Sequence, residues 1–167
     1  MLNTRVELIN WFTEESIPVD EDFLTNGVCR LLTHTGIDLI IEVPDLGPRV
    51  NFYAQLIRLD NSDESSILKY AMDINTRLKD TGGAAIGYKS EFDGLSLCFA
   101  YKLKEQNSKQ HFIDCLSWFV ENAEKISSKL ESHKRSIEKS GELTRYMSLP
   151  QPALFGQIKS FWQTIVH

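Results

Sequence analysis

Three segments with the pattern of β-strands follow one another early in the chain, over 28–34, 37–43 and 49–59. Apolar side chains occupy alternate positions in the second and third segments, which is typical of strands that bury one face. Thr35-Gly36 separates the first two segments, and a proline-bounded loop at 44–48 precedes the third. Strands joined by turns this short pair as antiparallel neighbours, so the chain is predicted to form a three-stranded meander.

Helical periodicity appears before, after and beyond this meander. The predicted helices cover 3–15, 64–80 and 109–132, and the last ends at Ser140-Gly141 at the latest. Between the second and third helices, 84–90 and 94–103 are predicted to form a β-hairpin around Asp93-Gly94, a strong turn signal.

The resulting order, α-β-β-β-α-β-β-α, indicates an α+β fold with a twisted, mainly antiparallel five-stranded sheet. Residues 1–132 are predicted to form this domain. Residues 133–167 are predicted to form a C-terminal helical extension, in which a short amphipathic helix covers 154–165 after the break at Leu149-Pro150. The chain of 167 residues has room for one such domain with an appendage.

Charge is divided unevenly along the chain. The formal net charge of −5 is the sum of −8 over 1–132 and +3 over 133–167. An acidic body disfavours nucleic acid as a partner, because phosphate binding needs a basic surface. No apolar stretch is long enough to span a bilayer, so membrane insertion is not expected either. The odd set Cys29, Cys98 and Cys115 lacks metal-ligand spacing, which favours a reducing compartment, the cytoplasm.

No catalytic, nucleotide-binding or metal-binding motif stands out, so we expect no enzyme activity, no cofactor and no metal site. A small enzyme that uses Cys29, His34 and Asp38 is the alternative from a different functional class, since the turn at Thr35-Gly36 could bring these residues near one another. The acidic run at 20–22 is predicted to be a solvated loop.

Two predicted helices carry more apolar surface than one small monomer needs to bury. The first has a predicted stripe with Trp11 beside it; the stripe is Leu2, Val6, Ile9 and Phe12. The second has a stripe flanked by Leu68 and Met72; the stripe is Ile67, Ala71, Ile74 and Leu78. Large apolar patches usually mark interaction sites, so the sequence predicts partner surfaces on both helices.

Three stretches resemble the class I type III secretion chaperones, the Tir-chaperone family of Gram-negative bacteria. One is the strand pair around 29–43 followed by RVNFYAQLIRL; another is SILKYAMDINTRLKDTGGAAIGYKSEFDGLSLCFAYKL; the third is HFIDCLSWFVENAEKI. The resemblance covers about 3–132, and the tail at 133–167 departs from the family pattern, which is usually complete at the end of the closing helix.

The resemblance implies a non-enzymatic homodimer in the bacterial cytoplasm, which requires neither nucleotide nor metal. It would bind the N-terminal chaperone-binding segment of one or more secreted effectors, keep that segment extended, and target it to the secretion apparatus, with the secretion ATPase as a further partner. The alternative within the same fold is a protein-binding or regulatory module without a secretion role.

An extended segment of this kind can add its backbone to an open sheet edge, and 28–33 is the natural candidate because it begins the meander. The residues predicted to bind the effector are Val6, Ile9, Phe12, Val28, Leu32, Ile40 and Ile57. The residues predicted to form the twofold interface are Ile67, Ala71, Ile74, Leu78 and Ile86.

Overall fold

The computed structural model describes residues 4–19, 21–44, 47–59, 64–103 and 109–147, with side chains described up to Ser140. The chain divides into two compact units, Met1–Glu131 and Ser132–His167. All five strands lie in the first unit. The helix predicted over 154–165 falls outside the described residues.

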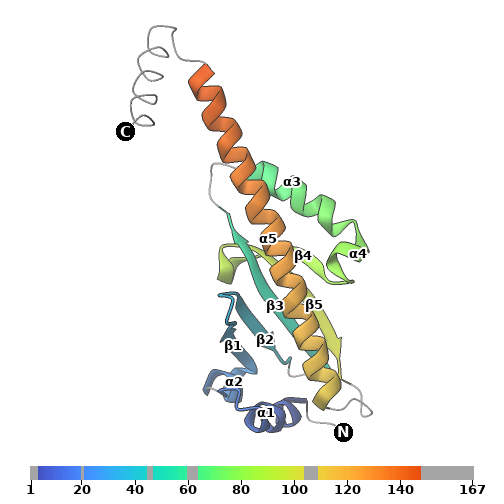
Figure 1. Ribbon diagram of the computed structural model, residues 1–167. Helices are drawn as coiled ribbons and strands as arrows, with labels where there is room; N and C mark the ends of the chain where they lie inside the picture. The colour runs from blue at the N-terminus through green and yellow to red at the C-terminus, as the bar shows by residue number, and fades with distance from the viewer. Residues whose placement is uncertain (1–3, 20, 45–46, 60–63, 104–108, 148–167) are drawn as a thin grey trace, which may run out of the picture. The chain divides into compact units, whose positions relative to one another are not determined.

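The sheet has five strands, all paired antiparallel, in the order β1-β2-β3-β5-β4 (Figure 1). The strands are β1 (Val28–Leu32), β2 (Asp38–Glu42), β3 (Arg49–Arg58), β4 (Ala85–Lys89) and β5 (Gly94–Lys102). The predicted α+β fold with an antiparallel five-stranded sheet is therefore confirmed. Its two edges are β1 and β4.

The helices differ from the predictions in three places. They are α1 (Thr4–Glu14), α2 (Glu21–Asn26), α3 (Glu64–Asn75), α4 (Leu78–Thr81) and α5 (Lys109–Met147), with a 3₁₀ turn, η1, at Ser90–Phe92. The segment predicted as a solvated acidic loop is α2, because Glu21 and Asp22 suit a helix N-terminus and Phe23 is buried beneath it.

The predicted helix over 64–80 is two helices, because Arg77 is extended (φ −105°, ψ 92°) between them. The prediction that the last helix ends by Ser140-Gly141 is wrong, since α5 continues to Met147. Ser140 fits the helix because its Oγ donates a hydrogen bond to Ser136 O at 2.9 Å, so this serine does not divert the backbone.

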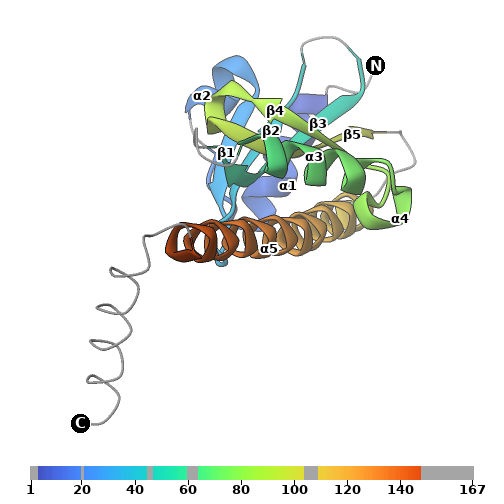
Figure 2. The ribbon, with the colours of Figure 1, turned by 90° about the horizontal axis from the view of Figure 1, so that it is seen from above.

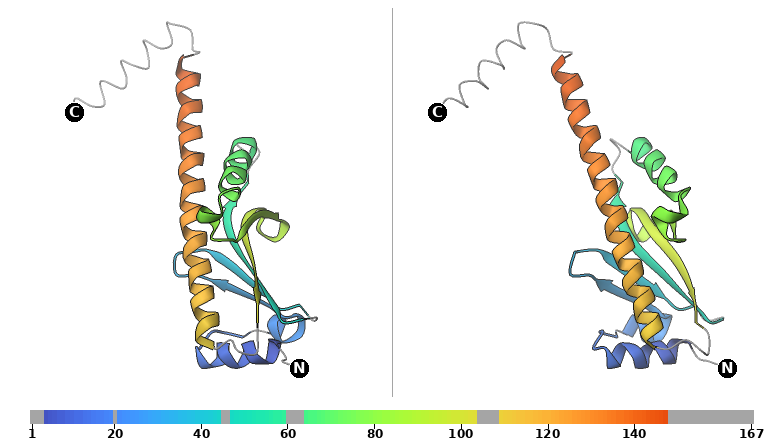
Figure 3. Two further views of the ribbon diagram at one scale, coloured as in Figure 1. Left: turned by 90° about the vertical axis from the view of Figure 1, so that its right-hand side faces the viewer. Right: turned by 45° about the vertical axis from the view of Figure 1, so that its right-hand side comes forward.

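The core lies between one face of the sheet and the part of α5 that belongs to the first unit, up to Glu131, which runs along that face in two perpendicular views (Figures 2 and 3). Phe52 at the centre of β3 has no exposed area and contacts the rings of Phe112 and Phe119 on α5, with centroids 5.7 and 5.5 Å away. Farther along α5, Ser127 Oγ donates to Leu56 O at 2.6 Å, beside the register shift between Gln55 and Ile57. These contacts with α5 therefore support β3, the central strand, on the core face of the sheet.

The core-facing side of α1 differs from the predicted stripe. Leu8 and Phe12 are fully buried and Thr4 is 5 % exposed, whereas Val6 is 49 % exposed. Residues four apart share a helix face, so the buried line passes through Leu8 and places Val6 on the opposite side. The helix ends at Glu14, and the turn that follows contains Ser16 with a left-handed φ of +57° and a hydrogen bond from the N–H of Ile17 to Phe12 O at 2.8 Å.

Candidate protein-docking surface

The edge strand β1 presents open backbone groups. Thr33 N–H donates to Ile37 O at 3.0 Å, and Val43 N–H donates to Gly27 O at 2.7 Å. Because bonded and non-bonded pairs alternate in an antiparallel ladder, these two bonds direct the backbone groups of the odd-numbered residues toward β2. Those of Val28, Arg30 and Leu32 point away from the sheet. Among the described residues, none provides a main-chain partner for these three N–H and three C=O groups.

Exposed apolar side chains lie on β1 and on the two helices that precede it. Leu32 at the end of β1 is 71 % exposed, Leu24 on α2 is 53 % exposed, and Val6 on α1 is 49 % exposed. The three elements form one lobe, since the rings of Phe12 and Phe23 lie 5.5 Å apart and α2 leads through Gly27 directly into β1. The lobe therefore combines unpaired strand backbone with accessible apolar groups. We call it the N-terminal lobe, defined as α1, α2, β1 and β2.

The seven residues predicted to bind an effector are placed unequally. Val6 and Leu32 are exposed, and Ile9 and Val28 are half-buried. Phe12, Ile40 and Ile57 have at most 4 % of their surface exposed, so in this structure they support the surface from below. Ile57 also pairs with Leu95 of β5, away from β1. Leu24 was missed, although the apolar pair that follows the acidic run could have indicated a helix that displays it.

The five residues predicted for a twofold interface are mostly internal. Ile67 and Ala71 have no exposed area, and Ile74 and Ile86 are 1 % and 4 % exposed. Leu78 is 73 % exposed, because the helix break at Arg77 turns α4 out of line with the α3 stripe. Met72 on α3 is 44 % exposed, and Tyr88 on the neighbouring strand β4 is 62 % exposed.

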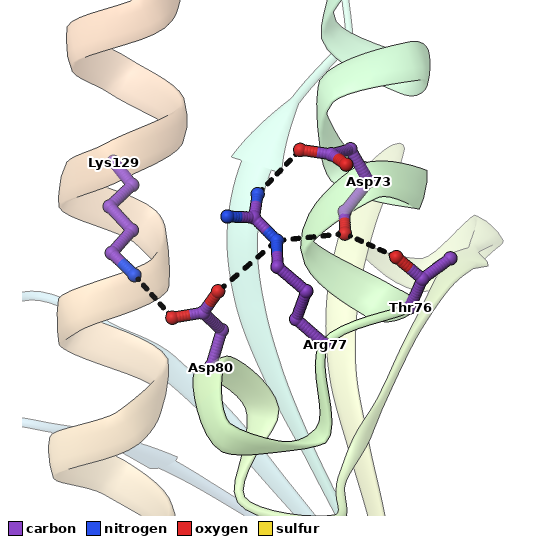
Figure 4. A network of polar contacts seen from close by, with 5 residues as sticks. All are labelled: Asp73, Thr76, Arg77, Asp80 and Lys129. Atoms are coloured by element: carbon purple, nitrogen blue, oxygen red, sulfur yellow. Dashed lines mark hydrogen bonds and ion pairs between the residues drawn. The ribbon is translucent and has the colours of Figure 1, made fainter.

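Polar contacts fix α4 against α5 (Figure 4). Arg77 pairs with Asp73 and Asp80, and Lys129 Nζ on α5 lies 3.2 Å from an Asp80 carboxylate oxygen. The hydrogen bond from Lys129 is the main cause that lowers the pKa of Asp80. Asn122 Nδ2 adds a hydrogen bond to Thr81 O at 2.6 Å. The short helix is thus held in one position, so Leu78 is presented from a fixed support.

The sheet face opposite α5 carries a hollow of about 410 Å³. Its lining is Asn51, Tyr53, Gly83, Ala85, Cys98, Phe99 and Ala100. Burial, with the nearby Glu42 carboxylate, raises the pKa of Tyr53 to about 12, so its phenol is neutral across the physiological range. Lys89 Nζ lies 4.2 Å from the centre of the Tyr53 ring.

The residues of the small-enzyme hypothesis are not brought together. Cys29 pairs with Ile41 and Asp38 pairs with Leu32, which places the two side chains on opposite faces of the sheet because strand side chains alternate. Cys29 is also 1 % exposed. Within the described ranges, no group of three or more His, Cys, Asp and Glu residues could hold a metal ion, and no helix there is long and apolar enough to cross a membrane.

Comparisons with known proteins agree with this architecture. Two solved structures have the same fold. A chain of the ExsC–ExsE complex matches with 16 % sequence identity and a TM-score of 0.58, and the match covers 78 % of this chain and 97 % of that chain. A chain of the ExoU–SpcU complex from the type III secretion system of Pseudomonas aeruginosa matches with 13 % identity and a TM-score of 0.54, and the match covers 74 % of this chain and 94 % of that chain. A search of curated proteins found no match. Residues 17–127 match the family described as Tir chaperone protein (CesT). With about two thirds of its length matched in this way, the chain belongs to the Tir chaperone protein (CesT) family.

Proposed function

We propose that this protein is a cytoplasmic chaperone that binds the N-terminal chaperone-binding segment of one or more type III secreted effectors. It keeps that segment extended and delivers it to the secretion apparatus. Membership of the Tir chaperone family supports the proposal, as does the fold shared with chains in the structures of the ExsC–ExsE and ExoU–SpcU complexes. Binding is non-covalent and needs no cofactor.

The open edge of β1 is the observation that carries this proposal. An extended segment that pairs with Val28, Arg30 and Leu32 can form main-chain hydrogen bonds without regard to its sequence. Each such bond contributes about 1 kcal/mol net. Specificity comes from apolar side chains of the segment that cover Val6, Leu24 and Leu32, each of which is at least 49 % exposed in the free chain. Backbone pairing and apolar burial together account for the retention of an unfolded segment.

We further propose that the chaperone is a homodimer formed through the outer side of α3 and α4. The predicted stripe of Ile67, Ala71 and Ile74 anchors α3 from inside, which leaves Met72 and Leu78 as the accessible apolar contacts. A twofold contact must be self-complementary, and crossed helices that each present a small apolar group meet that condition. A stable interface of ordinary size buries about 800 Å² per partner. The secretion ATPase remains a predicted partner that receives the loaded dimer.

Co-purification from the native host, followed by truncation of the passenger, tests the function. The expected passenger is a secreted protein whose isolated N-terminal segment is retained while the rest of it is not. A folded passenger domain retained instead, or a partner that is not secreted, would favour a regulatory binding module of the same fold. Light scattering tests the dimer separately, with an expected mass of twice 19.1 kDa.

A further inference from the structure

The second sheet edge, β4, is covered by a side chain from α3. The N–H of Ile86 donates to Asn75 Oδ1 at 2.9 Å, and Asn75 Nδ2 donates to Ile86 O at 3.3 Å. One carboxamide thus satisfies both main-chain groups of Ile86, as the peptide group of an added strand would do. Asn75 is the last residue of α3, so the helix end fixes the position of this amide.

Little of the β4 edge remains open beside this contact. Since the groups of Ile86 point away from β5, those of Tyr88 two residues later do so as well. At the start of the strand, Ala84 N–H donates to Thr81 O at 3.1 Å. Among the described residues of this edge, Tyr88 alone therefore presents an open N–H and C=O pair. The β1 edge presents three such residues.

An uncovered β4 edge would fit its own copy. Two β4 strands placed antiparallel about an axis through Gly87 would put Ile86 opposite Tyr88 of the second copy, so that the outward groups of both residues are bonded. Gly87 has no side chain to obstruct this approach, and Ala85 is small and exposed. Unprotected edges of this kind associate readily, and natural sheets cover or block them.

We propose that Asn75 is a specificity-determining residue that closes the β4 edge to the β4 edge of a second copy. With β4 closed, an additional strand pairs with the sheet at its other edge, β1. The second statement rests on the proposed function; the first does not. Each subunit then holds one extended segment, and copies do not join into a continuous sheet through β4.

Disulfide trapping tests the closure. Gly87→Cys reports pairing, because residues opposite each other at this axis would lie about 4.5 Å apart between Cα atoms, which a disulfide can bridge. The full-length chain carries Cys98→Ser in addition, since a Cβ at position 87 would lie 3.9 Å from Cys98 Sγ. With Asn75 present, we expect almost no disulfide between copies; with Asn75→Ala, we expect at least a tenfold increase in the cross-linked fraction.

Two further variants separate closure from a structural role. Asn75→Leu keeps the shape of the side chain but cannot bond Ile86, and it should increase the cross-linked fraction as Asn75→Ala does. Adding Tyr88→Pro to Asn75→Ala removes an outward N–H that an edge strand can spare, and it should abolish the disulfide. Equal cross-linking with and without Asn75, or none in either single variant, would overturn the proposal. The assay contains no effector, so loss of effector binding leaves its result unchanged.

Hydrogen exchange on the same full-length variants gives a second measurement. The Ile86 amide should be protected with Asn75 present and should exchange faster in Asn75→Ala, unless pairing at high concentration protects it again. Concentration-dependent recovery of protection is expected only if β4 edges pair. An Ile86 amide that exchanges rapidly in the parent chain would contradict the closure.

Discussion

Val6→Asp is the substitution that most directly tests the docking surface on α1. Val6 is 49 % exposed and lies opposite the buried line of Leu8 and Phe12. An exposed helix position away from the core tolerates substitution, so the free energy of unfolding should change by no more than about 0.5 kcal/mol. The variant therefore separates binding from folding.

The expected loss of affinity has two parts. Burying a valine completely is worth roughly 1.5–2 kcal/mol, so covering the exposed half of Val6 contributes about 0.8 kcal/mol, or about fourfold in Kd. An aspartate at the same place must in addition lose water around a charge without a partner, which costs several kcal/mol more. We expect the affinity for an effector segment to fall by about 100-fold or more. Val6→Ala keeps the β-carbon and removes two methyl groups, so it should reduce the affinity by about two- to threefold.

Calorimetric titration of the effector's N-terminal segment into each variant measures these losses, with urea unfolding as the check on stability. Val120→Asp is the matched control, since it makes the same change at a half-buried position on α5, outside the proposed surface. It should leave the affinity within about twofold. A Val6→Asp variant that folds normally and binds as tightly as the parent chain would refute the assignment of α1 to the binding surface.

Three other substitutions probe the supporting structure. Ser16→Gly should raise the free energy of unfolding by about 1 kcal/mol, because glycine adopts the left-handed φ of this helix end without steric cost, and the urea midpoint measures it. Gly82→Ala should lower stability, since φ is +61° and a methyl group would collide with the Trp118 ring; retained stability would contradict this packing. The lowered pKa of Asp80 adds stability above the carboxyl's unfolded pKa, and that stability is lost as pH falls through the folded pKa. Asp80→Asn should therefore flatten the decline in urea midpoint below about pH 4, while an unchanged acid limb would count against the contact with Lys129.

The alternation of apolar residues predicted the strands well because one face of the sheet is buried and the other is partly exposed. Along β3, Val50, Phe52, Ala54 and Leu56 are buried and the residues between them are partly exposed, so alternation in the sequence carries the register directly. Short turns then left little freedom in how the first three strands pair. The position of β4 at the far edge, beyond β5, follows from the hairpin together with the long pairing between β3 and β5.

The sequence predicted the helices less accurately where individual side-chain contacts determine whether a helix forms or where it ends. The six residues of α2 are too few for a periodic pattern, and buried Phe23 determines the helix. The break after Asn75 depends on Arg77 and Thr76, whose side chains bond back to Asp73 O at 3.3 and 2.8 Å. Such bonds compete with helix continuation, and their geometry is not visible in apolar spacing.

The sequence predicted which helix and strand form the candidate surface, but it predicted less well which of their residues are exposed. Helical spacing groups Val6, Ile9 and Phe12 on one side, but which part of that arc meets the core depends on how α1 lies against α2 and α5. The aromatic contacts of Trp11 and Phe12 with Phe112 settle this orientation and turn Val6 outward. The backbone groups of β1 are open because of register and edge position, which follow from pairing between strands.

Charge explains how a chain can keep such a surface exposed. The described residues over 4–19 and 21–44 carry seven carboxylates and two arginines, a net of −5, whereas those over 47–59 and 64–103 carry five carboxylates and seven basic residues, a net of +2. Like charge on the N-terminal lobe makes two copies repel where β1 and the apolar groups are open, and it attracts a segment that bears lysine or arginine. On the less charged side, repulsion is weak, and there the β4 edge is covered by Asn75 instead. Each edge is thus protected from self-association by a different means, and electrostatic protection leaves β1 accessible to another chain.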